Sequence, residues 1–398
     1  MCRNLRVSLT KYGVDYFGFS GFSSFEDDCE GYLFPDVEVF QISLSVAHVG
    51  CCFVSFFQSF SSSLDRPLRL CSTLFPSTFL FIPKYEFVER TNKDFKPRSR
   101  KVSLTFMEFR LDPSHPFDLN LTLCCGQAFR WDKQGYWWYG TTQGRVVKIR
   151  QKVNELEFEN VDRGLVIDYF GLRDNLPQIF ADISKDKHVE KAIAKCRGLR
   201  ILRQEPWECL ISYICATYKN IAAIKRMLLA LSRKFGEQTC FEGKDYYTFP
   251  TLEKLSKASL GELAKCELGY RAKYVSQTAK TIRKSGFDLE NLRKMSYKNA
   301  KKALLEFPGV GQKVADCVLL FSLGKLEAFP VDVWVRRAVA RHYAHHFPNE
   351  FVEKMLKGKS LSCSEYNKLN AFGRKHFGKY AGYAQEYLYH YERVCCKS

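Results

Sequence analysis

Hydrophobic and polar residues alternate in several short stretches that begin near residue 107. Alternation of this kind places the apolar side chains on one face, which is typical of a half-buried β-strand. Glycines stand between some of these stretches, where tight turns are needed. The stretches lie at 109–111, 119–123, 135–140, 145–150 and 156–159. We therefore expect a small antiparallel β-sheet domain over residues 107–165.

From about residue 166 the apolar residues recur at helical spacing instead, and Gly and Pro mark the junctions between candidate helices. The candidate helices span 176–180, 189–196, 206–217, 221–235, 252–256, 260–266, 271–284, 297–305, 313–323, 333–342 and 382–393. The regular alternation of strands and helices that a parallel sheet needs is missing. The predicted fold class is therefore α+β, with a mainly α-helical domain over 166–398.

The first 106 residues follow neither period for more than a few positions. They carry 16 of the 33 Phe, a single Ala and no Trp. An uncharged run over 39–64 is long enough to span a bilayer, but polar residues interrupt it, and we predict no membrane segment. We expect residues 1–106 to be disordered, or to be upstream sequence attached by a mistaken start, because a globular segment of this composition is unusual.

The positive charge of the chain belongs almost entirely to the part with regular patterns. Of the net +18, residues 1–106 contribute 12 Lys and Arg against 11 Asp and Glu, whereas residues 107–398 contribute 49 against 32. This excess favours a polyanionic partner, with nucleic acid as the first candidate. The 16 Cys show no paired Cys-x2-Cys spacing, so we predict no zinc site and expect the reduced thiols of an intracellular protein.

A short turn with two glycines joins two helical segments over 301–323. Gly309 and Gly311 lack the Cβ atoms that would block a phosphate, and the free N–H groups of the second helix would face that phosphate. This is the helix-hairpin-helix arrangement, which holds a DNA backbone without reading its sequence. A plain corner between two helices uses the same Gly-x-Gly turn, so this segment alone supports both interpretations equally.

Two ionisable residues near this turn are candidates for catalysis. Lys313 lies in the first turn of the second helix, where the positive end of the helix dipole disfavours an ammonium and leaves more neutral amine as a nucleophile. Asp332 follows 19 residues later, after a proline and before an apolar run. Each also has a plainer interpretation, because Lys313 could contact a phosphate in solvent and Asp332 could cap its helix, which stabilises by about 1 kcal/mol.

Six motifs, two of which carry Lys313 and Asp332, resemble those of the helix-hairpin-helix glycosylases of base excision repair. Within that superfamily the resemblance is to the 8-oxoguanine DNA glycosylase/AP lyases, and it covers about residues 109–393. The motifs in chain order are CGQAFRW at 125–131, LRQEPWEC at 202–209, LGYRAKY at 268–274, the hairpin, PVDV at 330–333 and YAGYAQ at 380–385. Six motifs in this order argue against a chance match.

The resemblance implies a mechanism. The damaged guanine is flipped out of the duplex, and the amine of Lys313 attacks C1′, displaces the base and forms a Schiff base, after which β-elimination can nick the strand. Asp332 stays ionised and stabilises the positive charge that develops on the sugar. The resemblance implies no cofactor and no metal. The expected partner is double-stranded DNA that contains 8-oxoguanine, bound by a monomer located inside the cell with the DNA.

The resemblance also implies the residues of a base pocket. The backbone carbonyl of Gly126 accepts a hydrogen bond from N7–H, a donor that 8-oxoguanine has and guanine lacks. Gln385 bonds the Watson–Crick edge, while Cys317 and Tyr389 sandwich the ring. Without the resemblance, Gln385 is equally a helix-surface amide and Tyr389 a core residue of an aromatic stretch.

Residues that contact DNA opposite the lesion are implied at five positions. Tyr270 is expected to wedge into the base stack, and Arg271 is expected to donate a hydrogen bond to the orphaned cytosine. Tyr218, in the same loop as Asn220, stands where the better-known members have Asn, and Ala223 stands where they have Arg. These departures predict weaker discrimination of the opposite base, with excision itself retained.

Other functions fit the sequence less well. An endonuclease-III-like enzyme needs a four-Cys iron–sulfur loop near the C-terminus, and only three Cys follow Asp332. In an alkylated-base glycosylase, Lys313 would have no catalytic role. The alternative from a different class is a non-catalytic helix-hairpin-helix DNA-binding protein, which needs the hairpin but has no use for Lys313, Asp332 and Gln385 together.

Overall fold

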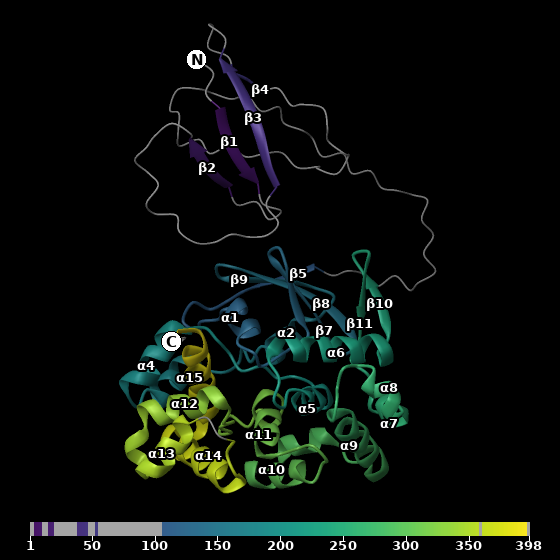
Figure 1. Cartoon of the computed structure of the whole chain (residues 1–398), viewed down its shortest axis with the longest axis vertical. Helices are drawn as coiled ribbons and strands as arrows, with labels where there is room; N and C mark the ends of the chain where they lie inside the picture. The colour runs from purple at the N-terminus through teal and green to yellow at the C-terminus, as the bar shows by residue number, and fades with distance from the viewer. Residues whose placement is uncertain are drawn as a thin grey trace. The chain divides into compact units, whose positions relative to one another are not determined.

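A computed structural model describes the chain over 106–357 and 360–395, together with the backbone of four strands closer to the N-terminus (Figure 1). The chain divides into two units, 1–100 and 101–398. In the first unit the strands pair antiparallel in the order β2-β1-β3-β4. They are β1 (Asn4–Leu9), β2 (Asp15–Phe19), β3 (Glu38–Val46) and β4 (Cys52–Val54). The sequence pattern, which follows neither period there for more than a few positions, did not indicate these four strands. The rest of 1–105, and with it the expectation of disorder or a mistaken start, lies outside the described residues.

The second unit begins with a five-stranded antiparallel sheet in the order β5-β9-β8-β7-β6. Two-residue turns join its central strands, and the turn between β7 and β8 places Gln143 and Gly144 at φ +48° and +70°. Both residues of a type I′ hairpin turn need such positive φ values, which explains the glycine. The strands are β5 (Phe106–Arg110), β6 (Trp131–Gln134), β7 (Trp137–Thr142), β8 (Arg145–Lys152) and β9 (Glu155–Glu159). The predicted antiparallel sheet is therefore confirmed.

One predicted strand of this region is instead a helix. Residues 119–123 belong to α1 (Leu119–Cys124), which begins where the side chain of Asp118 accepts a hydrogen bond from the N–H of Leu121 at 2.8 Å. Leu119 and Leu123 are buried one turn apart against the sheet. A run this short satisfies the periods of a strand and of a helix equally, and the N-cap decides between them.

Both faces of the sheet are covered. Trp138 and Ile149 share the face that packs on α1 and on α2 (Arg163–Tyr169). On the opposite face Tyr139 stacks on Tyr246 with ring centroids 6.0 Å apart. Tyr246 belongs to the hairpin of β10 (Gln238–Phe241) and β11 (Lys244–Tyr247), which lies within the stretch predicted to be helical. The sheet core therefore includes chain from both sides of the expected boundary at 165 and 166.

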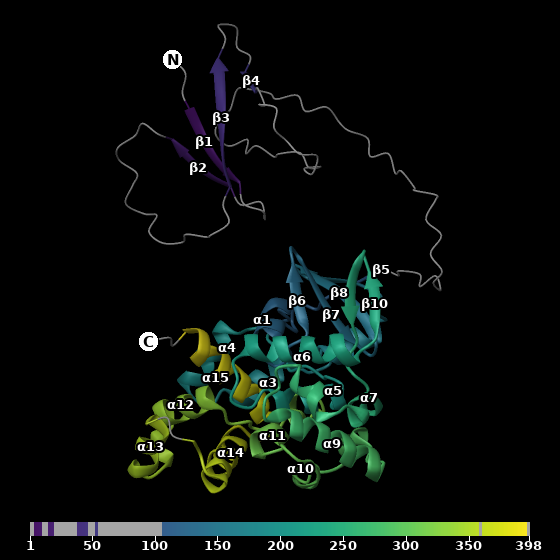
Figure 2. The ribbon, with the colours of Figure 1, turned by 45° about the vertical axis from the view of Figure 1, so that its right-hand side comes forward.

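The remaining chain is mainly helical, and Figures 1 and 2 show the sheet at one end of this unit and α9 to α14 at the other. The helices are α3 (Leu176–Ile183), α4 (Lys187–Lys195), α5 (Pro206–Cys215), α6 (Ile221–Phe235), α7 (Leu252–Lys257), α8 (Leu260–Ala264), α9 (Arg271–Ser285), α10 (Tyr297–Leu305), α11 (Gln312–Phe321), α12 (Val333–His342), α13 (Asn349–Leu356), α14 (Cys363–Phe377) and α15 (Ala381–Cys395). Short 3₁₀ turns lie at Leu289–Lys294, Ala344–His346 and Gly378–Tyr380.

All eleven predicted helices are present, while α2, α13 and α14 were missed. The start of α14 carried a readable signal, because Ser362 and Glu365 form a capping box, a pattern that marks helix N-termini. The α+β fold class is confirmed.

A buried carboxylate joins three of these helices. Asp316 of α11 is fully buried and accepts hydrogen bonds from the Nζ of Lys301 at 2.8 Å and from the hydroxyl groups of Tyr297 at 2.6 Å and Tyr366 at 2.7 Å. The amide of Asn370 donates a further bond at 3.0 Å. Burial raises the pKa of Asp316, and the Lys301 cation opposes that rise. These bonds hold α11 in one rotation between α10 and α14.

Replacing Lys301 tests how much this network contributes. Lys301→Met leaves a buried carboxylate without its counter-charge, so we expect the free energy of unfolding to fall by about 3–5 kcal/mol. Urea denaturation at pH 7 measures the change. Lys302→Met, at the exposed neighbouring position, is the matched control and should remain within about 0.5 kcal/mol of the wild type. Equal stability of the two variants would contradict a structural role for the ion pair.

Candidate active site

The turn between α10 and α11 has the shape that the two glycines predict, but each glycine has its own reason. Gly309 has φ +81°, and a Cβ atom there would lie 2.6 Å from the Cβ of Tyr274 on α9. The hydroxyl of Thr278 donates a 2.6 Å hydrogen bond to the carbonyl of Pro308, which ties the turn to α9. Gly309 is therefore required for packing the hairpin against α9.

Gly311 leaves the start of α11 open. It is the N-cap of α11, it is exposed, and a Cβ atom there would meet nothing within 4 Å. Its backbone is extended, and the helix has no side-chain hydrogen bond at its cap. The first N–H groups of a helix need partners, and a phosphate oxygen is a suitable acceptor for them. The hairpin thus presents backbone donors at the place predicted for a DNA phosphate.

Lys313 lies in the first turn of α11 and is half-buried. Its Nζ is 5.4 Å from the ring centroid of Tyr213 on α5, and the hydroxyl of Tyr213 donates to the carbonyl of Gln127 at 3.1 Å. The amine therefore faces the segment that follows α1. One turn further along α11, burial raises the pKa of the Cys317 thiol to about 12, so this thiol is neutral at pH 7 and suits an apolar contact with a base.

Asp332 has the helix-capping role that the sequence left open beside catalysis. It is the N-cap of α12, where its Oδ1 accepts hydrogen bonds from the N–H groups of Trp334 at 2.9 Å and Val335 at 2.8 Å. Both bonds end on Oδ1, so the cap does not use Oδ2. Burial raises the pKa of Asp332, while the Val335 N–H and the Lys313 charge oppose that rise. The cap holds the carboxylate in place within the electric field of the Lys313 amine.

The residues predicted for the base pocket include some from two distant segments that meet here. Gly126 has φ +105°, and a Cβ atom there would lie 3.0 Å from Ile221 and 3.2 Å from the hydroxyl of Tyr389 on α15. Only glycine fits this contact without displacing a neighbour. Gln385, one turn earlier on α15, is buried, and its Oε1 has no hydrogen-bond partner. The structure thus brings Gly126 next to Tyr389 and leaves a buried acceptor on Gln385.

The two residues expected at the orphaned cytosine differ in their exposure to solvent. Tyr270 is exposed, as a wedge must be. Arg271 is only 3% exposed, because its guanidinium donates to the carbonyl groups of Thr217 and Leu268 and lies 4.3 Å from the Tyr270 ring. Arg271 therefore ties α9 to the loop after α5, and its proposed contact with cytosine requires it to leave these partners.

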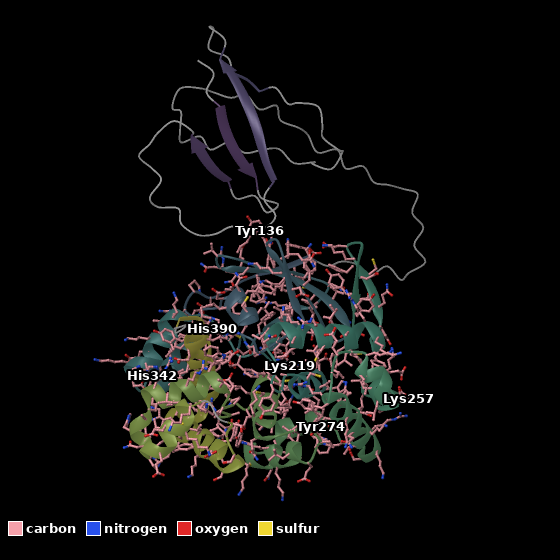
Figure 3. The ribbon with its side chains drawn as sticks, viewed as in Figure 1. Tyr136, Lys219, Lys257, Tyr274, His342 and His390 are labelled. Carbon is pink, nitrogen blue, oxygen red and sulfur yellow. The ribbon has the colours of Figure 1, made fainter. Side chains whose placement is uncertain are left out.

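The loop between α5 and α6 carries another exposed tyrosine that was predicted to contact DNA. Tyr218 is 84% exposed and has φ +53°, an uncommon conformation for a residue with a bulky side chain. Asn220 is the N-cap of α6, and its side chain accepts from the N–H of Ala223 at 2.9 Å. Lys219 of this loop and Tyr274 of α9 are labelled in Figure 3. The loop therefore presents an aromatic ring and a cation to solvent.

Three residues of the site were missed from the sequence. Tyr213 faces Lys313, and Arg393 donates to the carbonyl of Cys124 at 2.9 Å and to the hydroxyl of Tyr389 at 3.4 Å. Glu386 is a buried carboxyl beside the thiol of Cys125. Glu386 directly follows the YAGYAQ motif, and an ionisable residue amid the apolar residues of α15 was the available signal.

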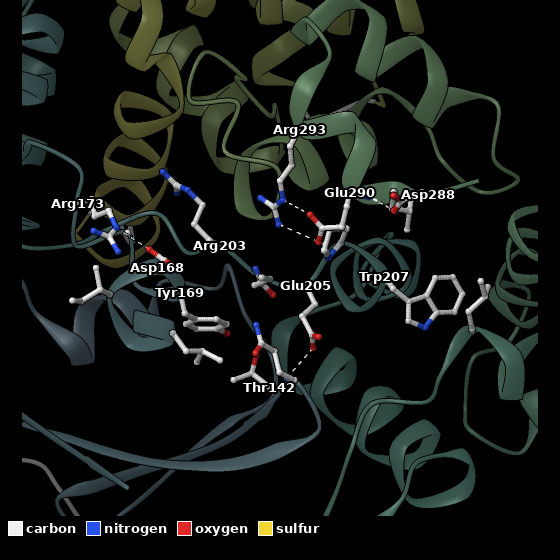
Figure 4. Close-up of a pocket in the computed structure, with 18 of the residues that line it drawn as sticks. Thr142, Asp168, Tyr169, Arg173, Arg203, Glu205, Trp207, Asp288, Glu290 and Arg293 are labelled. Atoms are coloured by element: carbon white, nitrogen blue, oxygen red, sulfur yellow. Dashed lines mark hydrogen bonds and ion pairs between the residues drawn. The ribbon is translucent and has the colours of Figure 1, made fainter. Parts of the chain in front are cut away.

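A cavity of about 800 Å³ lies elsewhere in this unit, between the sheet and the helices (Figure 4). Arg203 and Arg293 line it together with Asp168, Glu205 and Glu290, and several of these charges are already paired within the protein. None of the candidate site residues lines this cavity.

The described residues lack two further features. No group of three or more His, Cys, Asp or Glu in this part of the chain is arranged to hold a metal ion. No helix within the same residues has the length and apolar character needed to cross a membrane.

The antiparallel sheet, the helical region and the hairpin beside Lys313 and Asp332 define a helix-hairpin-helix protein of base excision DNA repair. Residues 110–210 match the N-terminal domain of 8-oxoguanine DNA glycosylases, and residues 211–359 match the HhH-GPD superfamily of base excision DNA repair proteins. N-glycosylase/DNA lyase OGG1 of Arabidopsis thaliana is 34% identical over 288 residues, which cover 68% of this chain and 76% of that protein. The N-glycosylase/DNA lyase of Saccharomyces cerevisiae is 35% identical over 308 residues, which cover 67% and 81%.

Solved structures agree. MBOgg1 in complex with a low-affinity DNA ligand superposes with a TM-score of 0.66 at 32% identity, covering 74% of this chain and 97% of that one. The 8-oxoguanine glycosylase/lyase of Clostridium acetobutylicum, bound to double-stranded DNA with cytosine opposite 8-oxoguanine, gives 0.64 at 33% identity, covering 70% and 93%. The chain belongs to the 8-oxoguanine DNA glycosylase family.

Serine at each hairpin glycine separates packing from phosphate binding. Gly309→Ser clashes with Tyr274 and forces a side chain into the left-handed region, so we expect the free energy of unfolding to fall by at least about 1–2 kcal/mol. Gly311→Ser should leave stability unchanged or slightly higher, because serine is a good N-cap, and should weaken binding to duplex DNA by occupying the N–H groups. Urea denaturation and fluorescence anisotropy measure the two effects. A Gly311→Ser protein that binds DNA normally would contradict the predicted phosphate contact.

Proposed function

We propose that this protein is a bifunctional DNA glycosylase, which excises 8-oxoguanine from duplex DNA and nicks the strand at the resulting site. The observation that carries the proposal is the carboxylate of Asp332, which is held at the start of α12 within the electric field of Lys313, the lysine in the first turn after the hairpin. The buried, unpartnered Oε1 of Gln385 supports it. A protein that only bound DNA would have no use for Lys313, Asp332 and Gln385 together.

In the first step the Nζ of Lys313 forms a bond, through its lone pair, to C1′ of the extruded nucleotide. The bond between C1′ and N9 breaks, and its electron pair leaves with the base, which takes up a proton. The carboxylate of Asp332 stabilises the positive charge on the sugar while this bond breaks. Loss of a proton from the amine and opening of the sugar ring at O4′ then give the Schiff base.

In the second step a proton leaves C2′, and the electron pair forms a double bond to C3′. The bond between C3′ and its phosphate oxygen breaks, which nicks the strand on that side. Water then hydrolyses the Schiff base and regenerates Lys313. The reaction uses no redox partner and requires no cofactor, since the protonated Schiff base that forms from the Lys313 amine serves as the electron sink.

Base recognition follows from the pocket. The carbonyl of Gly126 accepts from N7–H of 8-oxoguanine, Gln385 binds the Watson–Crick edge, and Cys317 and Tyr389 enclose the ring. The hairpin donors at Gly311 bind a backbone phosphate. We expect the protein to act as a monomer inside the cell, in whichever compartment holds its DNA.

Borohydride trapping tests the proposed chemistry. Reduction of the Schiff base on a duplex with one 8-oxoguanine should give a covalent protein–DNA adduct, which denaturing gel electrophoresis detects. Lys313→Gln should give no adduct, because it removes the amine that forms the bond. Lys257→Gln, at an exposed position of α7 labelled in Figure 3, is the control and should trap normally. An adduct that survives Lys313→Gln would exclude Lys313 as the nucleophile.

Opposite-base preference provides a second test. With Ala223 in place of an arginine and Arg271 held by Thr217, we expect excision rates on 8-oxoguanine opposite C, A, G and T to differ less than in the better-known members. Single-turnover rates at equal enzyme concentration measure this. Ala223→Arg should raise the preference for C roughly tenfold, the effect of one good base contact. A strict preference for C in the wild type would contradict the prediction.

A further inference from the structure

Glu386 is a buried carboxyl group that the proposed mechanism does not use. It follows Gln385 on α15, its side chain is 2% exposed, and its Oε1 has no hydrogen-bond partner. An unpaired polar atom at this depth costs free energy, and such atoms in folded proteins call for an explanation such as a missing ligand. The Oε1 of Gln385 is unpartnered and buried as well. Two consecutive residues of α15 thus hold acceptors without donors.

The groups around Glu386 come from five helices. The thiol of Cys125, at the end of α1, lies beside the carboxyl group and donates a hydrogen bond to the carbonyl of Thr122 at 3.2 Å. The Arg393 cation on α15 favours the ionised form, whereas the Asp332 carboxylate at the start of α12 disfavours it. The other titratable groups within reach are Cys317 of α11, Tyr213 of α5 and Tyr389 of α15.

This environment has two consequences. Two of these neighbours, Cys317 and Tyr389, are residues predicted for the base pocket, and Gln385 of that predicted pocket directly precedes Glu386, so the unpaired oxygen lies among them. Burial, as the largest cause, raises the pKa of Glu386 to about 7. The side chain can therefore exist in either form near neutral pH, which makes its ionisation measurable.

The base itself offers few donors. In 8-oxoguanine the N–H groups are N7–H, N1–H and the exocyclic N2–H₂. Since the Gly126 carbonyl is the proposed acceptor for N7–H, the remaining donors lie side by side on the Watson–Crick edge, the edge proposed for Gln385. A carboxylate accepts from such donors and repels a ring nitrogen with a lone pair, which is what adenine-type bases present at N1.

We propose that Glu386 is a further specificity-determining residue, whose free carboxyl oxygen accepts a hydrogen bond from the Watson–Crick edge of the extruded purine. The inference rests on the proposed function and extends it. The carboxylate selects bases with guanine-type N–H donors over bases with an adenine-type edge, and this selection is strongest when Glu386 is ionised.

The experiment compares affinity for duplexes that carry 8-oxoguanine or 8-oxoadenine, which share N7–H and differ on the Watson–Crick edge. All proteins carry Lys313→Gln, so that no base is excised during titration. As the ionised fraction of a group with a pKa near 7 rises about tenfold between pH 6 and pH 8, selectivity for 8-oxoguanine should rise about tenfold. Glu386→Gln keeps the shape but cannot ionise, so its selectivity should not change with pH.

Glu392→Gln is the matched control. Glu392 is a second buried carboxyl group on α15, but Arg341 pairs with it, so this variant should keep the wild-type pH profile. Burial lowers the pKa of His390 to about 4, which places its titration outside the range used. Identical pH profiles for Glu386→Gln and its parent would overturn the inference, as would a loss of the profile in Glu392→Gln.

Borohydride trapping by the wild type is performed first, because it separates a failure of the proposed function from a failure of the role of Glu386. If the wild type forms no adduct with 8-oxoguanine DNA, the proposed function fails. If it forms the adduct and Glu386→Gln leaves the pH dependence of selectivity unchanged, only the role of Glu386 fails. Thermal melting of each variant checks that a loss of the pH dependence of selectivity does not come from unfolding.

Discussion

The rotation of α11 is the constraint on which the rest of the site depends. The buried carboxylate of Asp316 is bonded to Lys301, Tyr297 and Tyr366, so α11 cannot turn without breaking bonds to α10 and α14. Because the rotation of α11 is fixed, the groups that its N-terminus and its faces expose are fixed as well. Its N-terminus remains open for a phosphate, while Lys313 faces Tyr213.

Three ionisable side chains lie within electrostatic reach of one another at the site, and each has a different environment. Lys313 lies against an aromatic ring, Asp332 is held by two backbone N–H groups, and Glu386 keeps an oxygen without a partner. A low local dielectric strengthens all of these interactions. The same burial raises the pKa of both carboxyl groups.

Local signals predicted most of the fold, and the errors have physical causes. Eleven helices followed from the spacing of apolar residues, whereas the run at 119–123 was too short to separate the two periods and was decided by the cap at Asp118. The hairpin of β10 and β11 was missed because its stability comes from contacts such as Tyr246 on Tyr139, which is distant in sequence. Likewise, the resemblance implied that Arg271 donates to the orphaned cytosine, whereas its guanidinium donates to backbone carbonyls inside the protein.

By itself the sequence determined the hairpin, the position of Lys313 in the first turn of its helix and the cap at Asp332, because each depends on residues close together in the chain. Only the tertiary structure decided which of these groups meet. The pocket joins a glycine at 126 to a tyrosine at 389, and it places Glu386 beside Cys125. Burial and unpaired atoms arise from contacts between distant segments, and no local pattern encodes them.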